Sequence, residues 1–398
     1  MKKVKKSIKV PAILNILLVP IAFLIAYALK GAPFISNFKR AKNNKWYKIK
    51  MGKSVVSSDG SRYFLFAKKG VSNNLMIYFS GGGLDFDFKT ASEPMSIKTV
   101  LSGKGMGYYF SNIPFYKLFL MNGILQENNT ENGFNDWNIV YIPYSTGDFH
   151  VGSNVKLYKE GEQQVKVRHN GSTNAQTALD WVFENISLPE KILVTGESAG
   201  GFGAAFWLQK IANHYSNSKI YEYSDSSYLN SDRWTEILDK EWNADFQNRF
   251  GFAPEDDLLG AAFKENSKKL PDTVTLLQSN TLTDHVLIKF QSLLNGKTLN
   301  RTARQQWTKQ MVNSMGYLDK KLKNYYFYLS DQGYDKKECG TPHTISHSSE
   351  FYTSAEEGIT LNKWLSDCVI RDNCYSVGGK FINAESKSIS DLQEDSEL

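Results

Sequence analysis

The amino-acid sequence predicts an α/β fold in which helices flank a mostly parallel sheet. Six short apolar runs are each followed by a turn signal, and amphipathic segments lie between several of them. This alternation of buried strands and helices is typical of α/β domains. One run leads directly into a glycine-flanked serine, at a place where such domains often carry their chemistry.

The six apolar runs have the length and composition of buried strands. They occupy residues 75–79, 137–142, 191–195, 220–223, 273–277 and 325–329. Two amphipathic segments, 174–185 and 200–214, flank the third run and predict helices. Because parallel strands end at the same edge of a sheet, we expect functional residues in the loops that follow these runs.

The first 30 residues predict a signal sequence or a membrane anchor. Five lysines precede an apolar stretch over residues 10–29, which is long enough to cross a bilayer as a helix. Ala26 and Ala28 supply the small residues that signal peptidases prefer, so cleavage is the alternative to anchoring. We therefore expect a domain that is membrane-anchored and faces outside, or one that is secreted.

The rest of the chain predicts one folded domain between two polar segments. Residues 31–53 contain seven basic residues, spread from Lys39 to Lys53, and predict a basic stalk. Residues 54–385 show no internal repeat and no long linker, which indicates a single α/β domain. Residues 386–398 are polar and rich in acidic residues, so we expect a disordered tail there.

The charge distribution argues against a nucleic-acid partner. The formal net charge is +6, and residues 1–30 alone contain six lysines and no acidic residue. The remaining chain is therefore formally neutral and lacks the excess of basic residues that binding to a polyanion requires. The three cysteines, Cys339, Cys368 and Cys374, lack the spacing of zinc ligands. Cys368 and Cys374 are close enough in sequence to pair, although sequence alone establishes no bridge.

The segment Gly196-Glu197-Ser198-Ala199-Gly200 fits the pattern of a nucleophile elbow. An apolar run precedes it, and a helix rich in small residues is expected after it. In this motif a sharp strand-to-helix turn exposes the serine hydroxyl above the sheet, and the glycines permit close approach of strand and helix. The alternative is an ordinary turn between a strand and a helix. We expect Ser198 to be a nucleophile.

A nucleophilic serine needs a base, usually a histidine that a carboxylate orients. In domains with this elbow the partners follow the serine in the order acid, then histidine. His343 lies at the apex of the loop after residues 325–329 and is the preferred base, whereas His347 is expected near the surface or the substrate. Asp225 and Asp284 both follow strands, and position alone favours Asp284.

The loop Ser80-Gly81-Gly82-Gly83-Leu84 predicts an oxyanion hole. Consecutive glycines let backbone N–H groups point inward, where they can act together with the N–H of Ala199. A phosphate-binding loop is the alternative, but the Lys-Ser/Thr pair that such a loop needs after its glycines is missing.

Several ordered blocks resemble the pectin acetylesterase / Notum family of carboxylesterases, in its bacterial form. They cover roughly residues 54–370 and are Asn132–Asn138, Pro143–Gly152, His169–Asn170–Gly171 with Asn174–Ala175, Gly196–Gly201, Asp225–Ser227, His343–Thr344, Phe351–Thr353, Gly358–Leu361 and Trp364–Leu365. Leu84 and Asp85 depart from the family, which often has Trp and Cys after its glycines. Ser145 likewise stands where plant and animal members often carry Cys.

The resemblance implies an α/β-hydrolase-like fold that uses no cofactor, and the cysteine spacing already argued against a metal site. It implies Ser198 as nucleophile, Asp284 as acid and His343 as base, and it gives Asp225 a structural role. It also implies that the oxyanion is bound by the N–H groups of three residues, Gly82, Gly83 and Ala199.

These features predict a serine carboxylic ester hydrolase that removes O-acetyl groups from a polysaccharide. The expected partners are an acylated polysaccharide or another ester and, through the N-terminal segment, a membrane. Two alternatives stay open: a degenerate hydrolase that only binds glycan, and an acyltransferase that uses the same three side chains.

Overall fold

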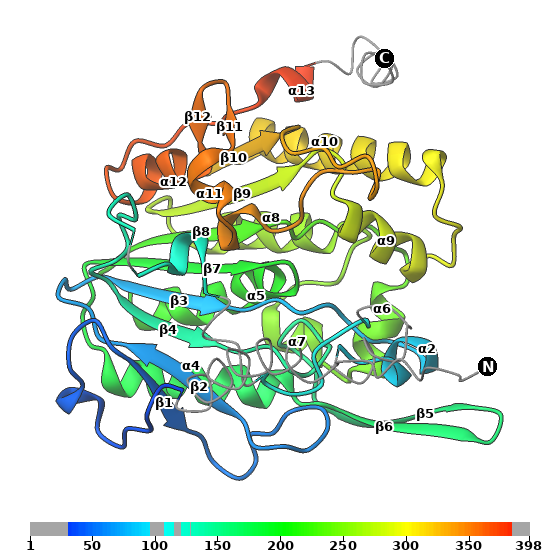
Figure 1. The fold of residues 1–398 in the computed structure, drawn as a ribbon, viewed down its shortest axis with the longest axis horizontal. Coiled ribbons are helices and arrows are strands. Elements are labelled where there is room, and N and C mark those ends of the chain that lie inside the picture. The colour runs from blue at the N-terminus through cyan, green and yellow to red at the C-terminus, as the bar shows by residue number, and fades with distance from the viewer. Residues whose placement is uncertain (1–30, 96–106, 115–120, 128, 384–398) are drawn as a thin grey trace, which may run out of the picture.

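The computed structural model describes residues 31–95, 107–114, 121–127 and 129–383 of the chain (Figure 1). Its centre is an eight-stranded sheet with the strand order β1-β2-β4-β3-β7-β8-β9-β10. The strands are β1 (Trp46–Lys50), β2 (Phe64–Lys68), β3 (Leu75–Phe79), β4 (Asn138–Ile142), β7 (Lys191–Glu197), β8 (Lys219–Asp225), β9 (Val274–Thr281) and β10 (Tyr325–Ser330). The six strands from β4 to β10 run parallel, and β1 and β2 are antiparallel additions at one edge.

Helices and short strands fill the connections between these strands. The helices are η1 (Phe38–Arg40), α2 (Phe88–Ser92), η3 (Gly123–Leu125), α4 (Gly171–Asn185), α5 (Ala199–His214), α6 (Trp234–Glu236), η4 (Ile237–Glu241), α7 (Phe246–Phe250), α8 (Leu258–Lys269), α9 (His285–Leu294), α10 (Arg301–Lys321), η5 (Ile345–His347), α11 (Glu350–Thr353), α12 (Leu361–Val369) and α13 (Gly379–Asn383). Two further strand pairs lie outside the main sheet: the hairpin β5 (Asn154–Glu160) and β6 (Gln163–His169), which projects from the body in Figure 1, and β11 (Ala355–Glu356) with β12 (Ile359–Thr360).

The predicted fold class is confirmed. All six apolar runs form strands of the parallel part of the sheet, and the two amphipathic segments lie within α4 and α5. The observed strands extend the expected ones by up to four residues, mainly at their carboxyl ends, because polar residues there continue the ladder.

Strand alternation divides the interior into two cores, one on each face of the sheet. In β3, Leu75, Ile77 and Phe79 face the core that contains α4, α5, α8, α9 and α10. Met76 and Tyr78 face the opposite core, which packs against η3, η5, α11 and α12. Because both faces are covered, the central strands are buried along their whole length, as expected for a parallel sheet.

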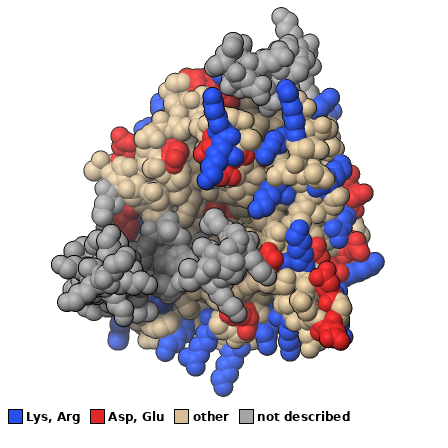
Figure 2. Space-filling view, turned by 45° about the vertical axis from the view of Figure 1, so that its right-hand side comes forward, with Lys and Arg blue, Asp and Glu red and all other residues tan. Residues whose placement is uncertain are grey.

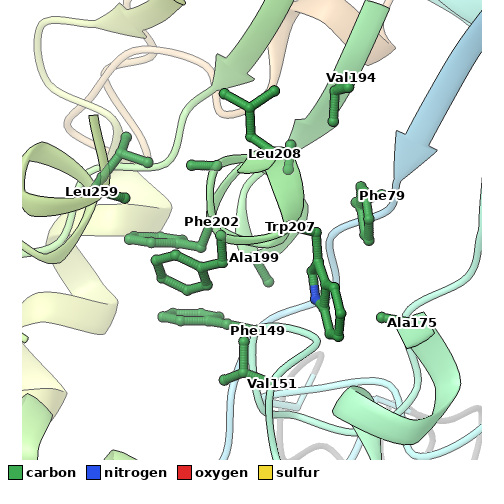
Figure 3. Close-up of a cluster of buried hydrophobic side chains, with 14 of the residues drawn as sticks. Phe79, Phe149, Val151, Ala175, Val194, Ala199, Phe202, Trp207, Leu208 and Leu259 are labelled. Carbon is green, nitrogen blue, oxygen red and sulfur yellow. The ribbon is translucent and has the colours of Figure 1, made fainter. Parts of the chain in front are cut away.

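Helix α5 lies at the centre of the first core. Figure 3 shows Phe202 and Leu208 of this helix among buried side chains from several elements. The ring of Phe202 stacks on Phe149, with ring centroids 4.3 Å apart and planes 3° from parallel. Leu208 is fully buried. This packing fixes the helix that begins at the strand-to-helix turn.

The expected boundary of the domain at residue 54 is wrong. Within the predicted stalk 31–53, Trp46–Lys50 forms edge strand β1, which pairs with β2 along five residues. Phe38, Tyr47 and Ile49 are buried in the first core. The basic side chains alternate with these apolar ones, so the segment is an amphipathic edge of the domain and not a separate stalk.

The predicted N-terminal anchor 1–30 and the tail 386–398 lie outside the described residues. Within the described part of the chain, no helix is both long enough and apolar enough to cross a bilayer. All three cysteines are unpaired: Cys339 is exposed, Cys374 is half-buried and Cys368 is buried.

We expect Leu208→Ala to lower the free energy of unfolding by about 2–5 kcal/mol, because it opens a cavity in the first core. Leu188→Ala is the matched control, since Leu188 is 75% exposed and its truncation should change stability by no more than about 0.5 kcal/mol. Urea unfolding of both variants measures the difference. Equal losses would contradict the assigned core.

Candidate active site

The carboxyl ends of the parallel strands bring the sequence-predicted residues to one edge of the sheet. The glycine loop follows β3, Ser198 follows β7, and Asp284 lies three residues beyond β9. The strand register aligns these ends, because Phe79 pairs with Gly196 and Glu197 pairs with Asp225. Segments that are far apart in sequence therefore meet at this edge.

Ser198 occupies a strained turn between β7 and α5. Its backbone has φ 54° and ψ −125°, which is unfavourable for a residue with a Cβ atom. The turn is held by two hydrogen bonds: the Ser198 N–H donates to the Asp225 carbonyl at 2.8 Å, and the Gly201 N–H donates to the Ser198 carbonyl at 3.0 Å. The neighbouring strand and the helix thus hold Ser198 in this conformation. Ser198 itself is only partly buried.

Two glycines make this turn sterically possible. A Cβ atom on Gly196 would collide with the backbone of Gly200, and one on Gly200 would collide with the carbonyl of Phe79. The helix therefore approaches β7 and β3 more closely than any side chain would allow. This explains the glycines of the elbow from packing alone.

Asp284 and His343 form a hydrogen-bonded pair. Nδ1 of His343 lies 2.7 Å from Oδ2 of Asp284, and Asp284 is fully buried. The loops that carry them are joined, because the Thr341 N–H donates to the Thr283 carbonyl at 3.0 Å. Oδ1 of Asp284 caps α9 by accepting the N–H groups of Val286 and Leu287, each at 3.0 Å. These hydrogen bonds orient the carboxylate of Asp284 toward the imidazole of His343.

The surroundings of His343 favour its protonated form. Burial lowers its pKa, but the charge of Asp284 and the hydrogen bond to it, with smaller contributions from Asp225 and Glu197, outweigh burial and raise the pKa above its ordinary value. An imidazole in this environment can accept a proton and be stabilised as imidazolium.

Asp225 does not pair with His343. It instead fixes the segment of the chain that follows His343. Its Oδ2 accepts the N–H and the hydroxyl of Ser346, at 2.9 and 2.6 Å, and its Oδ1 accepts the hydroxyl of Ser279 at 2.6 Å. Burial raises the pKa of Asp225, and these hydrogen bonds offset that effect in part. Sequence position alone left both Asp225 and Asp284 as candidates for the acid, and their contacts distinguish them.

The glycine loop lies against the serine turn. The Gly81 N–H donates to Oε1 of Glu197 at 2.9 Å, whereas the N–H groups of Gly82 and Gly83 donate to no acceptor among the described residues. Gly83 has φ +76°, and a Cβ atom there would collide with the Tyr108 carbonyl. Backbone N–H groups without an acceptor in the described part of the protein are the kind of donor that an oxyanion hole requires.

Asp85, which with Leu84 departs from the resembled family, is fully buried, and Leu84 is 2% exposed. The backbone N–H of Asp85 donates to the carbonyl of Gly147 at 3.0 Å, and its carbonyl accepts the indole N–H of Trp242 at 2.8 Å. Both residues therefore pack into the domain interior.

The remaining histidines have other partners. Nε2 of His150 lies 3.0 Å from the Ser80 carbonyl, and burial lowers its pKa to about 4. Nε2 of His169 lies 3.0 Å from the Tyr158 hydroxyl, and burial lowers its pKa to about 3. The ring of His347 lies 6.2 Å from that of Tyr78. The buried imidazoles of His150 and His169 are therefore neutral near pH 7 and have structural roles. No cluster of three or more His, Cys, Asp or Glu side chains suited to a metal occurs among the described residues.

Glu197 is the site residue that sequence reasoning passed over. It occupies the variable position before the serine, is 6% exposed and contacts the glycine loop. An acidic residue directly after an apolar strand, inside a motif of small residues, was the available signal.

A family profile described as pectinacetylesterase matches residues 40–245, which is more than half of the chain. The chain belongs to the pectinacetylesterase family. The matched segment contains the glycine loop and the elbow, whereas Asp284 and His343 lie beyond it. Membership of this family supports carboxylic ester hydrolysis as the general activity.

Two solved structures of the Wnt deacylase Notum from Drosophila are similar to this pectinacetylesterase-family chain. One crystal form has a TM-score of 0.54 and 15% identity, over 83% of this chain and 94% of that chain. The other has a TM-score of 0.52 and 14% identity, over 83% and 97%. At this identity the similarity shows the fold alone. Comparison with curated proteins gave no match.

We expect Asp284→Asn to lower the pKa of His343 more than Asp225→Asn does, because only Asp284 contacts the imidazole. Removing a nearby negative charge destabilises the imidazolium, so both shifts should be downward. Nuclear magnetic resonance titration of histidine-labelled protein measures the pKa, with His343→Gln to assign the signal. A larger shift in the Asp225 variant would reverse the assignment of the two acids.

Gly83→Ala should destabilise the protein more than Gly296→Ala. Both glycines have positive φ, so each alanine pays about 1–2 kcal/mol for the left-handed conformation. Only the alanine at 83 also collides with backbone, because nothing lies within 4 Å of a Cβ atom at Gly296. Urea unfolding compares the two variants, and equal stability would show that the loop is free to move.

Proposed function

We propose that this protein is a serine carboxylic ester hydrolase that removes O-acetyl groups from a polysaccharide. The observation that carries the proposal is the 2.7 Å contact between His343 and a buried Asp284, at the sheet edge where Ser198 occupies a strained turn. A carboxylate, an imidazole and a serine on a tight turn are the groups that acyl transfer to serine requires.

The proposed reaction begins with the attack of the Ser198 hydroxyl oxygen on the ester carbonyl carbon. His343 accepts the hydroxyl proton, and Asp284 orients the imidazole and stabilises its charged form. The carbonyl oxygen becomes an oxyanion, which the N–H groups of Gly82, Gly83 and Ala199 stabilise. Ala199 is the first residue of α5, so the positive end of the helix dipole acts in the same direction.

The second half of the reaction releases both products. The C–O bond of the tetrahedral intermediate breaks, and His343 gives its proton to the departing sugar alcohol. Water then attacks the acyl-enzyme while His343 removes one of its protons. Collapse of the second intermediate releases the acid and restores the Ser198 hydroxyl.

The family name supports acetyl as the acyl group and a polysaccharide as the alcohol. The name of the Notum structures describes removal of an acyl group by a protein of the same fold. Lys and Arg side chains occur together with Asp and Glu side chains on the face drawn in Figure 2, so this face does not carry charge of a single sign. We propose that the enzyme acts outside the cytoplasm, tethered or released through residues 1–30.

Ser198→Ala should lower hydrolysis of p-nitrophenyl acetate by about four to six orders of magnitude, because the nucleophile is lost. A fluorophosphonate probe should label the wild-type protein at Ser198 and leave this variant unlabelled. The thermal unfolding temperature serves as the control for an intact fold.

Full activity in the Ser198→Ala variant would refute the mechanism, and an unlabelled wild-type protein would favour the degenerate glycan-binding alternative. An acetylated polysaccharide, with release of acetate as readout, tests the substrate. Appearance of acetyl groups on an added acceptor sugar would identify a transferase.

A further inference from the structure

Glu197 lies between the Ser198 turn and the glycine loop, and the proposed reaction assigns it no step. It is the last residue of β7 and precedes Ser198, and its side chain is almost fully buried. Its Oε1 accepts the Gly81 N–H at 2.9 Å, so it contacts the glycine loop directly. A carboxylate is costly to bury unless it is hydrogen-bonded, and the Gly81 N–H supplies such a bond here.

The contact with Gly81 determines which amides of the glycine loop remain free. Because the Gly81 N–H is committed to Glu197, the amides left without an acceptor among the described residues are those of Gly82 and Gly83. The Cβ of Ser198 also lies within 3 Å of where a Cβ on Gly81 would be, so the loop and the nucleophile are in close contact. The hydrogen bond therefore fixes the loop relative to the serine.

The charge of Glu197 acts on several neighbours at once. Strand alternation places Glu197 on the same face as Leu193, toward Tyr78 of β3 and Tyr141 of β4. Burial raises the pKa of each of these phenols, and the charge of Glu197 raises both further, which keeps the phenols protonated. The groups that face Glu197 thus include these two neutral phenols and Asp225, its partner in the β7–β8 register, and the ring of His347 lies 6.2 Å from that of Tyr78.

The charged groups around His343 come from three elements. Asp284 follows β9 and contacts the imidazole, Asp225 ends β8, and Glu197 ends β7. All three favour the imidazolium over the neutral ring. Glu197 and Asp225 act from a distance, whereas Asp284 acts by contact.

Resting on the proposed function, we infer that Glu197 is a positioning residue with two effects on the reaction. Its carboxylate holds the glycine loop so that the Gly82 and Gly83 amides face the oxyanion, and its charge stabilises the imidazolium that His343 forms when Ser198 attacks. The nucleophile-elbow motif accepts any residue at the position of Glu197. The role of Glu197 is therefore specific to this chain and does not follow from the motif.

Two substitutions separate these effects. Glu197→Gln keeps an oxygen that can accept the Gly81 N–H but removes the charge, so kcat/KM at its pH plateau should change by less than about tenfold. Its acid limb should move to lower pH, because the imidazolium is less stable without the charge of Glu197. Glu197→Ala also releases the loop and should lower kcat by about 10²-fold, close to the loss of one oxyanion donor, with little change in KM.

Glu222→Gln is the matched control. Glu222 is also a buried strand carboxylate, bonded to the Ser224 hydroxyl, but it is not among the carboxylates that chiefly raise the pKa of His343. Its replacement should leave the acid limb of kcat/KM in place. Direct titration of His343 by nuclear magnetic resonance, which needs no activity, should show the same downward shift of its pKa in the Glu197→Gln protein.

The outcomes distinguish the two levels of the proposal. If the pKa of His343 does not move in Glu197→Gln, or if Glu197→Ala keeps full kcat, the role of Glu197 is refuted while the hydrolase stands. If Ser198→Ala remains active, the proposed function itself fails. A loss of activity in Glu197→Gln without a shift of the acid limb would indicate a merely structural role.

Discussion

The close approach of helix α5 to strands β3 and β7 is the constraint on which the site depends. Gly196 and Gly200 permit it, since any Cβ atom at either position would collide with backbone. This contact accompanies the strained, positive-φ conformation of Ser198, and the glycine loop, which leaves β3, lies directly beside the serine turn. Sterics at two positions therefore determine where the Ser198 turn and the glycine loop meet.

Three buried carboxylates lie at this edge of the sheet, and each makes different contacts. Asp284 contacts the imidazole and also caps α9, so the helix holds it in place. Asp225 binds Ser346 and fixes the loop after His343. Glu197 reaches in the other direction, to the glycine loop. A site with several buried negative charges favours a positive imidazolium, which is the charge that the proposed reaction develops.

The edge strand β1 shows how charge patterns can mislead. The basic residues between Lys39 and Lys53 suggested a stalk, but Tyr47 and Ile49 alternate with lysines and are buried. A strand at the edge of a sheet needs only one apolar face, and lysines on its other face discourage pairing with further strands. The sequence contained this alternation of apolar and basic residues, but a count of the basic residues alone did not reveal it.

The sequence by itself determined the parallel core and the elbow. Buried strands read as apolar runs because both faces are covered, and the glycines around Ser198 follow from local sterics. The order of acid and histidine along the chain narrowed the choice to Asp225 and Asp284. Only the tertiary structure distinguished their contacts, because side chains 59 residues apart, such as Asp284 and His343, meet through loop packing that no local pattern encodes. The contact of Glu197 with Gly81, 116 residues away, depends for the same reason on the register of β3 and β7.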